Sequence, residues 1–307
     1  MPITKAQFSQ RSKRLGGSDV AAVIGVDPWR NAGDVWLEKT EQVKPAEPTP
    51  AMLAGTHFET AILDWASETL GPLTRNQYRS RVDLCLGTHA DALTRAGNEP
   101  VEAKTAGLFG PLVDDWGDDG TDQVPEHVWA QAHAHMIVAP ARVCHVPTFL
   151  GGRGFAMFRV DYDEEFGNHL IEYLPFWWKE YVATRTPPPD VTPHLDVLKR
   201  RFRFPGEPAE VADDLIEAVE AATNLRKAAV KAEEEAKAAV VAALGASIWG
   251  QSTSGRTVTY REQSARHVDS ARLKAAGLYD EYVNVSTFPV LRFPKRTPKL
   301  MIKELMG

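Results

Sequence analysis

Two acidic residues and one lysine lie in a short segment whose pattern predicts a β-hairpin. The segment, residues 89–107, reads HADALTRAGNEPVEAKTAG, and its polar centre RAGN predicts a tight turn at 96–97. A turn centred there pairs Asp91 directly with Glu102. Lys104 follows on the same face as Glu102, because side chains along a strand alternate with a period of two. Since directly opposed residues have Cβ atoms about 5 Å apart, two carboxylates and one ammonium group are predicted to meet on one face.

This arrangement of charges favours the binding of a hard divalent cation. Two carboxylates at such a separation repel unless one is protonated or a cation lies between them. Mg²⁺ is held at about 2.0–2.1 Å by one or two carboxylates together with waters and substrate phosphates. The carbonyl group of Ala103 is available as a further oxygen ligand, and Lys104 is suited to orient or deprotonate a water and to stabilise charge on a phosphate. The D-x(n)-E-x-K pattern alone is equally compatible with an exposed hairpin that carries an ordinary Glu–Lys pair.

The elements expected around the hairpin are those of an α/β protein. Hydrophobic periodicity predicts helices over 52–71 and 125–138. Ser18 or Asp19 is expected to cap a short helix that runs to Ile24. The remaining expected elements are a helix over 32–39, strands over 73–80, 82–88 and 100–105, a hairpin of 143–150 with 155–162, and a long helix over 164–183.

The C-terminal third of the chain has a different pattern. A proline-rich segment, TRTPPPDVTP, precedes a predicted boundary between a first domain over 1–205 and a C-terminal module over 206–307. Apolar residues recur every three or four positions over 208–244, among Glu, Lys and Ala. This predicts either one helix of up to ~50 Å or a helical hairpin. Strands over 255–263 and 288–295 are expected to cap it.

Composition places the chain among ordinary globular proteins. Of its 307 residues, 43% are hydrophobic and 25% charged, and no apolar run approaches the ~20 residues that span a bilayer. We see no apolar signal segment at the N-terminus, and Cys85 and Cys144 have no metal-type spacing. We therefore expect a cytoplasmic protein. The net charge of −6 excludes a wholly basic surface, but clusters such as RNQYRSR at 75–81 and KRRFR at 199–203 allow a local basic groove.

Four segments, in order, resemble motifs of one enzyme family. They are RLGGSDVAAVIGVDPWRNAGDVWLEKT, AGTHFETAIL, THADAL with VEAKTA, and VPEHVWAQAHAHM. They resemble the N-terminal signature, the G-x-x-x-E helix, the PD…(D/E)-x-K hairpin and the glutamine-bearing helix of the YqaJ-type viral recombinases. That family is a branch of the PD-(D/E)XK nucleases related to lambda exonuclease. The resemblance covers about residues 11–182. It implies a restriction-endonuclease-like core, with a mixed sheet flanked by helices, before a C-terminal helical or coiled-coil module with β-strands.

The resemblance assigns roles to the charged residues of the hairpin. It implies that Asp91 and Glu102 ligate Mg²⁺, for which Mn²⁺ is an expected substitute, with help from the Ala103 carbonyl. Lys104 would position the attacking water. Glu59, on the helix over 52–71, would close the metal site directly or through a water.

Three further residues take roles from the same resemblance. Gln131 would hold the water or the scissile phosphate from the opposite side. Arg14 and Ser18 lie in the signature that, in relatives, is near the 5′-phosphate end of DNA. A short helix that begins at Ser18 suits this role, because its free N–H groups attract an anion.

The chain also departs from the family pattern. Ala90 replaces the proline of PD, and Ala92 replaces the glycine that often follows the aspartate, so strand geometry is affected more than the ligand set. His133 stands where a second glutamine is common. We expect His133 and His135 to be ordinary, partly exposed histidines rather than zinc ligands, because two residues apart on a helix they point in different directions.

These features predict an enzyme that hydrolyses DNA phosphodiesters with Mg²⁺. The resemblance implies a 5′→3′ exonuclease on linear duplex ends that leaves 3′ single strands for phage-type recombination. It also implies a single-strand annealing protein as partner and a homo-oligomer, often a trimeric ring in relatives. Alternatives are an endonuclease or single-strand nuclease of the same fold, and a non-catalytic scaffold that binds DNA ends. Four of the eight tryptophans, Trp29, Trp36, Trp65 and Trp129, are expected to be core or interface residues rather than base-stacking platforms.

Overall fold

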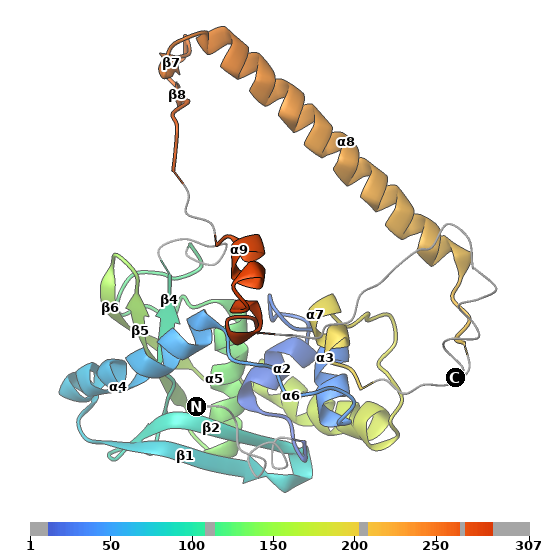
Figure 1. Ribbon diagram of the computed structural model, residues 1–307. Helices are drawn as coiled ribbons and strands as arrows, with labels where there is room; N and C mark the ends of the chain where they lie inside the picture. The colour runs from blue at the N-terminus through green and yellow to red at the C-terminus, as the bar shows by residue number, and fades with distance from the viewer. Residues whose placement is uncertain (1–11, 108–113, 203–207, 265–267, 285–307) are drawn as a thin grey trace. The chain divides into compact units, whose positions relative to one another are not determined.

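A computed structural model describes residues 12–107, 114–202, 208–264 and 268–284. The chain forms two compact units, Met1–Arg203 and Phe204–Gly307 (Figure 1). Whether these units are the two functional domains expected from the sequence, with a boundary at residue 205, stays a prediction.

A mixed β-sheet is the centre of the first unit. β1 (Leu73–Arg81) lies at one edge and pairs antiparallel with β2 (Leu86–Thr94), which pairs antiparallel with β3 (Pro100–Val101). β3 and β4 (Lys104–Ala106) both pair parallel with β5 (Val143–Leu150). β6 (Gly154–Asp161) pairs antiparallel with β5, as the expected hairpin requires.

The second strand of the hairpin over 89–107 is interrupted. A continuous strand over 100–105 was expected, but Glu102 and Ala103 belong to neither β3 nor β4. Val101 pairs with His145 and Lys104 with Thr148, so β3 and β4 keep one register along β5. They are therefore two segments of one strand, with a break where its acidic residue lies.

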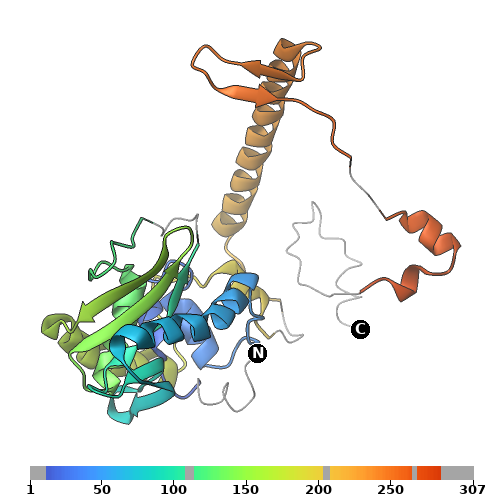
Figure 2. The same cartoon turned by 90° about the vertical axis from the view of Figure 1, so that its left-hand side faces the viewer.

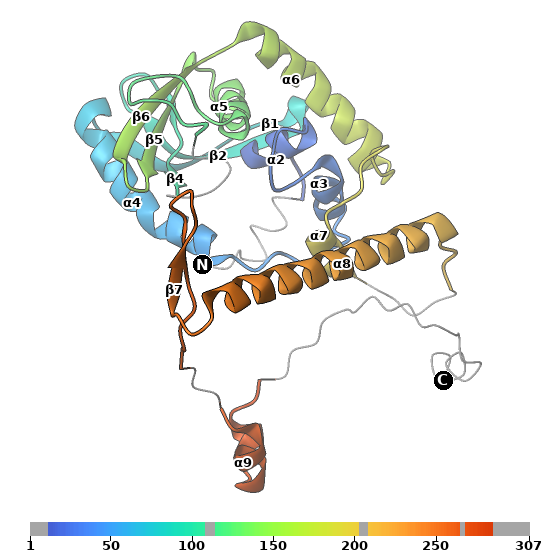
Figure 3. The same ribbon diagram turned by 90° about the horizontal axis from the view of Figure 1, so that it is seen from above.

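Helices cover both faces of this sheet (Figure 3). α4 (Pro50–Leu70) buries Leu63 against Ala92 and Val101 on one face. α5 (Glu126–Val138) packs Val128, Ala132 and Met136 against the β5–β6 hairpin on the other. This mixed sheet flanked by helices confirms the fold class expected for the first unit.

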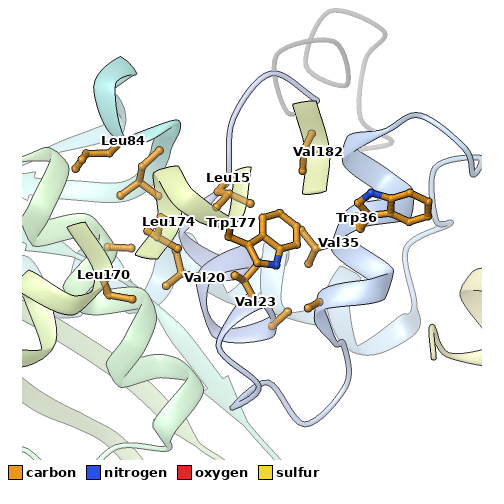
Figure 4. Packing of buried hydrophobic residues seen from close by; sticks show 14 of the residues in the cluster. Leu15, Val20, Val23, Val35, Trp36, Leu84, Leu170, Leu174, Trp177 and Val182 are labelled. Carbon is orange, nitrogen blue, oxygen red and sulfur yellow. The ribbon is translucent and has the colours of Figure 1, made fainter. Parts of the chain in front are cut away.

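A second layer of helices lies beyond α5 and holds the largest buried cluster (Figure 4). α2 (Gly17–Val23), α3 (Ala32–Lys39) and α6 (Glu164–Trp177) contribute most of it. α6 continues as a π-helix over Trp178–Ala183, so the long helix expected over 164–183 is present as two forms in succession. α7 (Leu195–Lys199) ends the described elements of this unit. Trp177, on α6, is 1% exposed among Leu15, Val20 and Val35.

The second unit contains one long helix and a small hairpin (Figure 2). α8 (Asp213–Leu244) is a single helix of 32 residues, so the alternative of a helical hairpin is wrong. β7 (Trp249–Gln251) pairs antiparallel with β8 (Thr257–Thr259), and α9 (Ser270–Ala275) follows. The strand expected over 288–295 lies outside the described residues.

Candidate active site

Asp91 and Glu102 occupy opposed positions, as the turn of the hairpin requires. β2 and β3 pair Ala92 with Val101, and continuing this antiparallel register by one residue brings Asp91 opposite Glu102. Beyond Val101 the backbone leaves β2, and the Ala103 N–H donates a hydrogen bond of 2.8 Å to Asp91 Oδ2. The break in the strand thus fixes the carboxyl group of Asp91 from the backbone side.

Glu102 is the centre of a buried polar cluster. Its carboxylate oxygen Oε1 accepts hydrogen bonds from Lys104 Nζ at 2.8 Å and from Gln131 Nε2 at 2.6 Å. The Gln131 Oε1 atom accepts a second hydrogen bond from Lys104 Nζ, also at 2.8 Å. Burial disfavours the charged carboxylate, but Lys104 and His135 outweigh it and lower the pKa of Glu102 to about 2. Glu102 is therefore ionised at neutral pH although its residue is only 6% exposed.

Asp91 has the opposite electrostatic behaviour. Burial, the charge of Glu102 and the charge of Glu59 together raise the pKa of Asp91 to about 8. Without a cation, Asp91 is thus mostly protonated at neutral pH. Glu59, on α4, is half-buried and lies near enough for its charge to act on Asp91. The structure therefore brings Asp91 and Glu102 together, with the charge of Glu59 acting on Asp91.

Lys104 stays charged in this environment. Burial disfavours its ammonium group, but Glu102 overcomes this effect and raises the pKa of Lys104 above its ordinary value. An ammonium group that does not lose its proton at neutral pH acts by charge and hydrogen bonding rather than as a base.

The two histidines of α5 differ from the expectation. Both are buried, His133 at 0% and His135 at 1% exposed, so the prediction that they are partly exposed is wrong. His133 accepts a hydrogen bond from the Asp163 N–H at 3.0 Å and so joins α5 to the start of α6. The two side chains point in different directions, as expected, so His133 and His135 have different surroundings.

His135 belongs to the site and was missed from the sequence. Its Nε2 atom lies 3.1 Å from Glu102 Oε2, and its Nδ1 atom lies 3.0 Å from Thr88 Oγ1. Gln131 and His135 lie four residues apart on α5, and that spacing places both on the face that covers Glu102. A Cβ atom at Gly17 would lie 3.4 Å from both Gln131 Cγ and His135 Nε2, so the backbone of α2 closes over this pair.

The donor set of this cluster fits a hard divalent cation. Glu102 Oε2 is buried and accepts no hydrogen bond from the described residues, although His135 Nε2 lies 3.1 Å away. Among the described residues, no three His, Cys, Asp or Glu side chains lie close enough to hold a metal by themselves. Asp91 and Glu102 would then be the principal protein ligands, with the remaining positions left to the backbone, waters and substrate. That ligand set is the one Mg²⁺ prefers.

Arg14 and Ser18 lie beside α2 without direct contact to the acidic pair. The helix begins at Gly17 and Gly16 is its N-cap residue, so Ser18 does not cap it, whereas Asp19 contributes to the cap by accepting from the Gly16 N–H. The Arg14 side chain packs on Gly87 of β2, and Ser18 is exposed. Neither side chain makes a hydrogen bond or ion pair with a described residue.

Charged residues of the N-terminal segment form an ion-pair network within the fold. Asp19 accepts from the Gly16 N–H at 2.8 Å and pairs with Lys39 Nζ at 2.5 Å and Arg30 at 3.0 Å. Burial alone would raise the pKa of Asp19, but Lys39 and Arg30 hold it far below its ordinary value. This network joins α2 to α3, and sequence reasoning did not identify it.

No helix within the described ranges is both long and apolar enough to cross a membrane.

Comparison with known sequences finds one family. Residues 8–142 match the family of the YqaJ-like viral recombinase domain. The uncharacterized protein YqaJ of Bacillus subtilis (strain 168) is 20% identical over 204 residues, which are 63% of this chain. The match spans 61% of the length of that protein.

Comparison with solved structures finds weaker likenesses. An alkaline exonuclease (LHK-Exo) from Laribacter hongkongensis is 14% identical, with a TM-score of 0.49, over 60% of this chain and 94% of that one. A phage related exonuclease from Haemophilus somnus 129PT is 11% identical, with a TM-score of 0.42, over 56% of this chain and 96% of that one. The matched segment, residues 8–142, includes both Asp91 and Glu102 of the α/β fold. The chain therefore resembles the YqaJ-like viral recombinase domain over residues 8–142, which are less than half of its length.

Proposed function

We propose that this protein is a Mg²⁺-dependent deoxyribonuclease that degrades linear duplex DNA from its ends. The observation that supports the proposal most directly is the opposed pair Asp91 and Glu102, with Lys104 and Gln131 hydrogen-bonded to the same carboxylate oxygen. A pair of buried acids of which one is protonated in the absence of a cation is a costly arrangement for stability alone.

The residues that would hold the cation are Asp91 and Glu102, with the Ala103 carbonyl and with Glu59 directly or through a water. When bound, such a cation supplies Lewis-acid polarisation of a phosphoryl oxygen and acidifies water. The unpartnered Glu102 Oε2 atom and the raised pKa of Asp91 both support a ligand role for these carboxylates.

The remaining residues act on the phosphate and on the nucleophile. The Lys104 ammonium is held by Glu102 and Gln131, so it presents a fixed positive charge beside the acidic pair. Such a charge stabilises the negative charge that develops on the phosphoryl oxygens in the transition state. Gln131 orients Lys104 through its side-chain carbonyl oxygen. When Glu102 binds the cation, the Gln131 side chain would be available to hold a water or the scissile phosphate.

The form of the substrate is proposed from the resemblance of residues 8–142 to the YqaJ-like viral recombinase domain. We infer 5′→3′ digestion of duplex ends that leaves 3′ single strands for recombination with an annealing partner protein. Arg14 and Ser18 would receive the 5′-phosphate, because both lie at the start of α2 and neither side chain is paired with a described residue. A homo-oligomer, such as a trimeric ring, would let an acidic protein surround DNA with its basic residues turned inward.

Incubation of end-labelled linear duplex and of closed circles, each with Mg²⁺ and with EDTA, tests the proposal. We expect release of nucleotides from linear DNA only, and only with the metal. Cutting of circles would favour an endonuclease, and absence of cutting would favour a scaffold that binds DNA ends. Lys104→Ala should abolish cleavage and leave DNA binding largely intact, and a variant that still digests DNA at the normal rate would show that the site lies elsewhere.

A further inference from the structure

A cavity of about 340 Å³ lies beside the proposed active site and has no role in the mechanism above. This volume is at the small end of the range of about 300–1,000 Å³ that is usual for ligand pockets. It is bounded by the loop between α2 and α3, by an acidic segment and by the first turn of α5. Its lining includes Val26, Pro28, Asp114, Asp115, Glu126 and His127.

The cavity is one helical turn from the catalytic cluster. His127 and Gln131 are four residues apart on α5, so their side chains leave the same face of the helix. Lys104 is close enough to act on His127, because burial and the positive charge of Lys104 both lower the pKa of His127. Because Gln131 accepts a hydrogen bond from Lys104 Nζ, one face of α5 carries both a lining residue of the cavity and a partner of Lys104.

Trp29 stands at the same place with its indole ring uncovered. Its residue is 63% exposed, so Trp29 is not a core residue, whereas Trp36 is buried; an interface role for Trp29 stays a prediction. The rings of Trp29 and His127 are in edge-to-face contact, with centroids 5.1 Å apart and an interplanar angle of 83°. Asp27 holds the loop, since its Oδ1 atom accepts hydrogen bonds from the Trp29 N–H at 2.8 Å and the Arg30 N–H at 3.1 Å.

The lining selects the kind of ligand. The carboxylates of Asp114, Asp115 and Glu126 repel a phosphate, but they accept hydrogen bonds from the amino and imino groups of a base. An exposed indole offers a stacking surface that suits any base. Resting on the nuclease function proposed above, we propose that Trp29, His127 and this cavity bind one unpaired nucleobase of the DNA strand beside the scissile phosphate.

Abasic substitution tests this binding site. A tetrahydrofuran residue replaces the nucleotide at the first or the second position of the strand that is digested. For the natural protein we expect the abasic site at one of these positions to lower kcat/KM about tenfold, as is usual for one lost stacking contact. In Trp29→Ala the intact and abasic substrates should be cut with equal kcat/KM, and Trp29→Phe should keep part of the difference.

The matched control is Phe176→Ala, which removes another exposed aromatic side chain, 53% exposed on α6. It should discriminate against the abasic substrate as the natural protein does. Equal cutting of intact and abasic DNA by the natural protein, or full discrimination by Trp29→Ala, would overturn the inference while the nuclease function stood. If the natural protein cut neither substrate, the proposed nuclease function itself would be refuted.

A binding measurement does not depend on cleavage. DNA with 2-aminopurine at the sensitive position should lose fluorescence on binding to Lys104→Ala, and should lose much less on binding to the double variant with Trp29→Ala. Circular dichroism of both variants establishes that they are folded. Equal quenching by the two variants would refute the stacking role of Trp29. Quenching of the free 2-aminopurine mononucleotide at the same concentration would assign the cavity to released product and overturn its assignment to the DNA strand.

Discussion

His135 Nε2 lies 3.1 Å from Glu102 Oε2, although the two residues are 33 positions apart in the sequence and both are buried. The other nitrogen of the ring lies 3.0 Å from Thr88 Oγ1 on β2. The imidazole is thus fixed between a strand and the acidic pair. Together with Lys104 it keeps Glu102 charged in a place where burial would favour the protonated acid.

Replacement of His135 should therefore change the pH dependence of the reaction. In His135→Leu the loss of this neighbour raises the pKa of Glu102, so the acid limb of the kcat/KM profile moves to higher pH. We expect kcat/KM at neutral pH to fall about 10- to 100-fold, as is usual when a residue that orients a metal ligand is removed. His169→Leu, a replacement of a histidine that is exposed on α6, is the control. An acid limb that stays in place would show that His135 only fills space.

Binding of Mg²⁺ should release a proton from Asp91. The pKa of Asp91 is about 8 without a cation, and a ligand carboxylate must be deprotonated. Below pH 8 the affinity for Mg²⁺ should thus fall by about tenfold for each pH unit, and it should level off above pH 8. Calorimetry at pH 7 in two buffers of different ionisation enthalpy measures the proton released, for which we expect close to one per site. The same titration at pH 9 should release almost none, and equal release at both values would contradict the assignment.

The same carboxyl group should destabilise the protein when the metal is absent. The pKa of Asp91 is about 8 in the folded protein, against an ordinary value of 3.8 for the unfolded chain. Between these two pH values the folded state therefore binds more protons than the unfolded state. Stability should fall as pH rises through this window and stay low above it. Asp91→Asn removes the charge and keeps an oxygen that accepts from the Ala103 N–H. In EDTA at pH 8.5 we expect it to be more stable than the natural protein by about 1–2 kcal/mol. A lower unfolding midpoint for Asp91→Asn would argue against the raised pKa.

The Asp19 network should stabilise the fold rather than the chemistry. Asp19→Asn removes the carboxylate that pairs with Lys39 and Arg30, and breaking a buried ion pair costs about 3–5 kcal/mol. Because the folded pKa of Asp19 is far below 3.8, this stability is present at neutral pH and is lost as pH falls below about 4. Asp64→Asn removes one partner of the exposed Arg75–Asp64 pair and should cost no more than about 1 kcal/mol. Urea unfolding at pH 7 compares the two variants, and equal losses would contradict the structural role of Asp19.

The sequence by itself determined the register of the hairpin. The position of its turn and the alternation of side chains pair Asp91 with Glu102, and both effects are local. Local periodicity likewise predicted α4, α5 and α6, because each helix needs one apolar face to pack. The order of motifs was sufficient to place Glu59, Lys104 and Gln131 in one family pattern.

Only the tertiary structure decided what surrounds the acidic pair. The break at Glu102 and Ala103 arises because the strand leaves β2 after Val101 and continues along β5, a choice between partners distant in the sequence. The burial of His135 depends on α2 closing over α5 at Gly17, and the exposure of Trp29 depends on the loop between two helices. The pKa values of Asp91 and Glu102 differ for the same reason, since burial and the charges nearby come from segments that meet only in the folded chain.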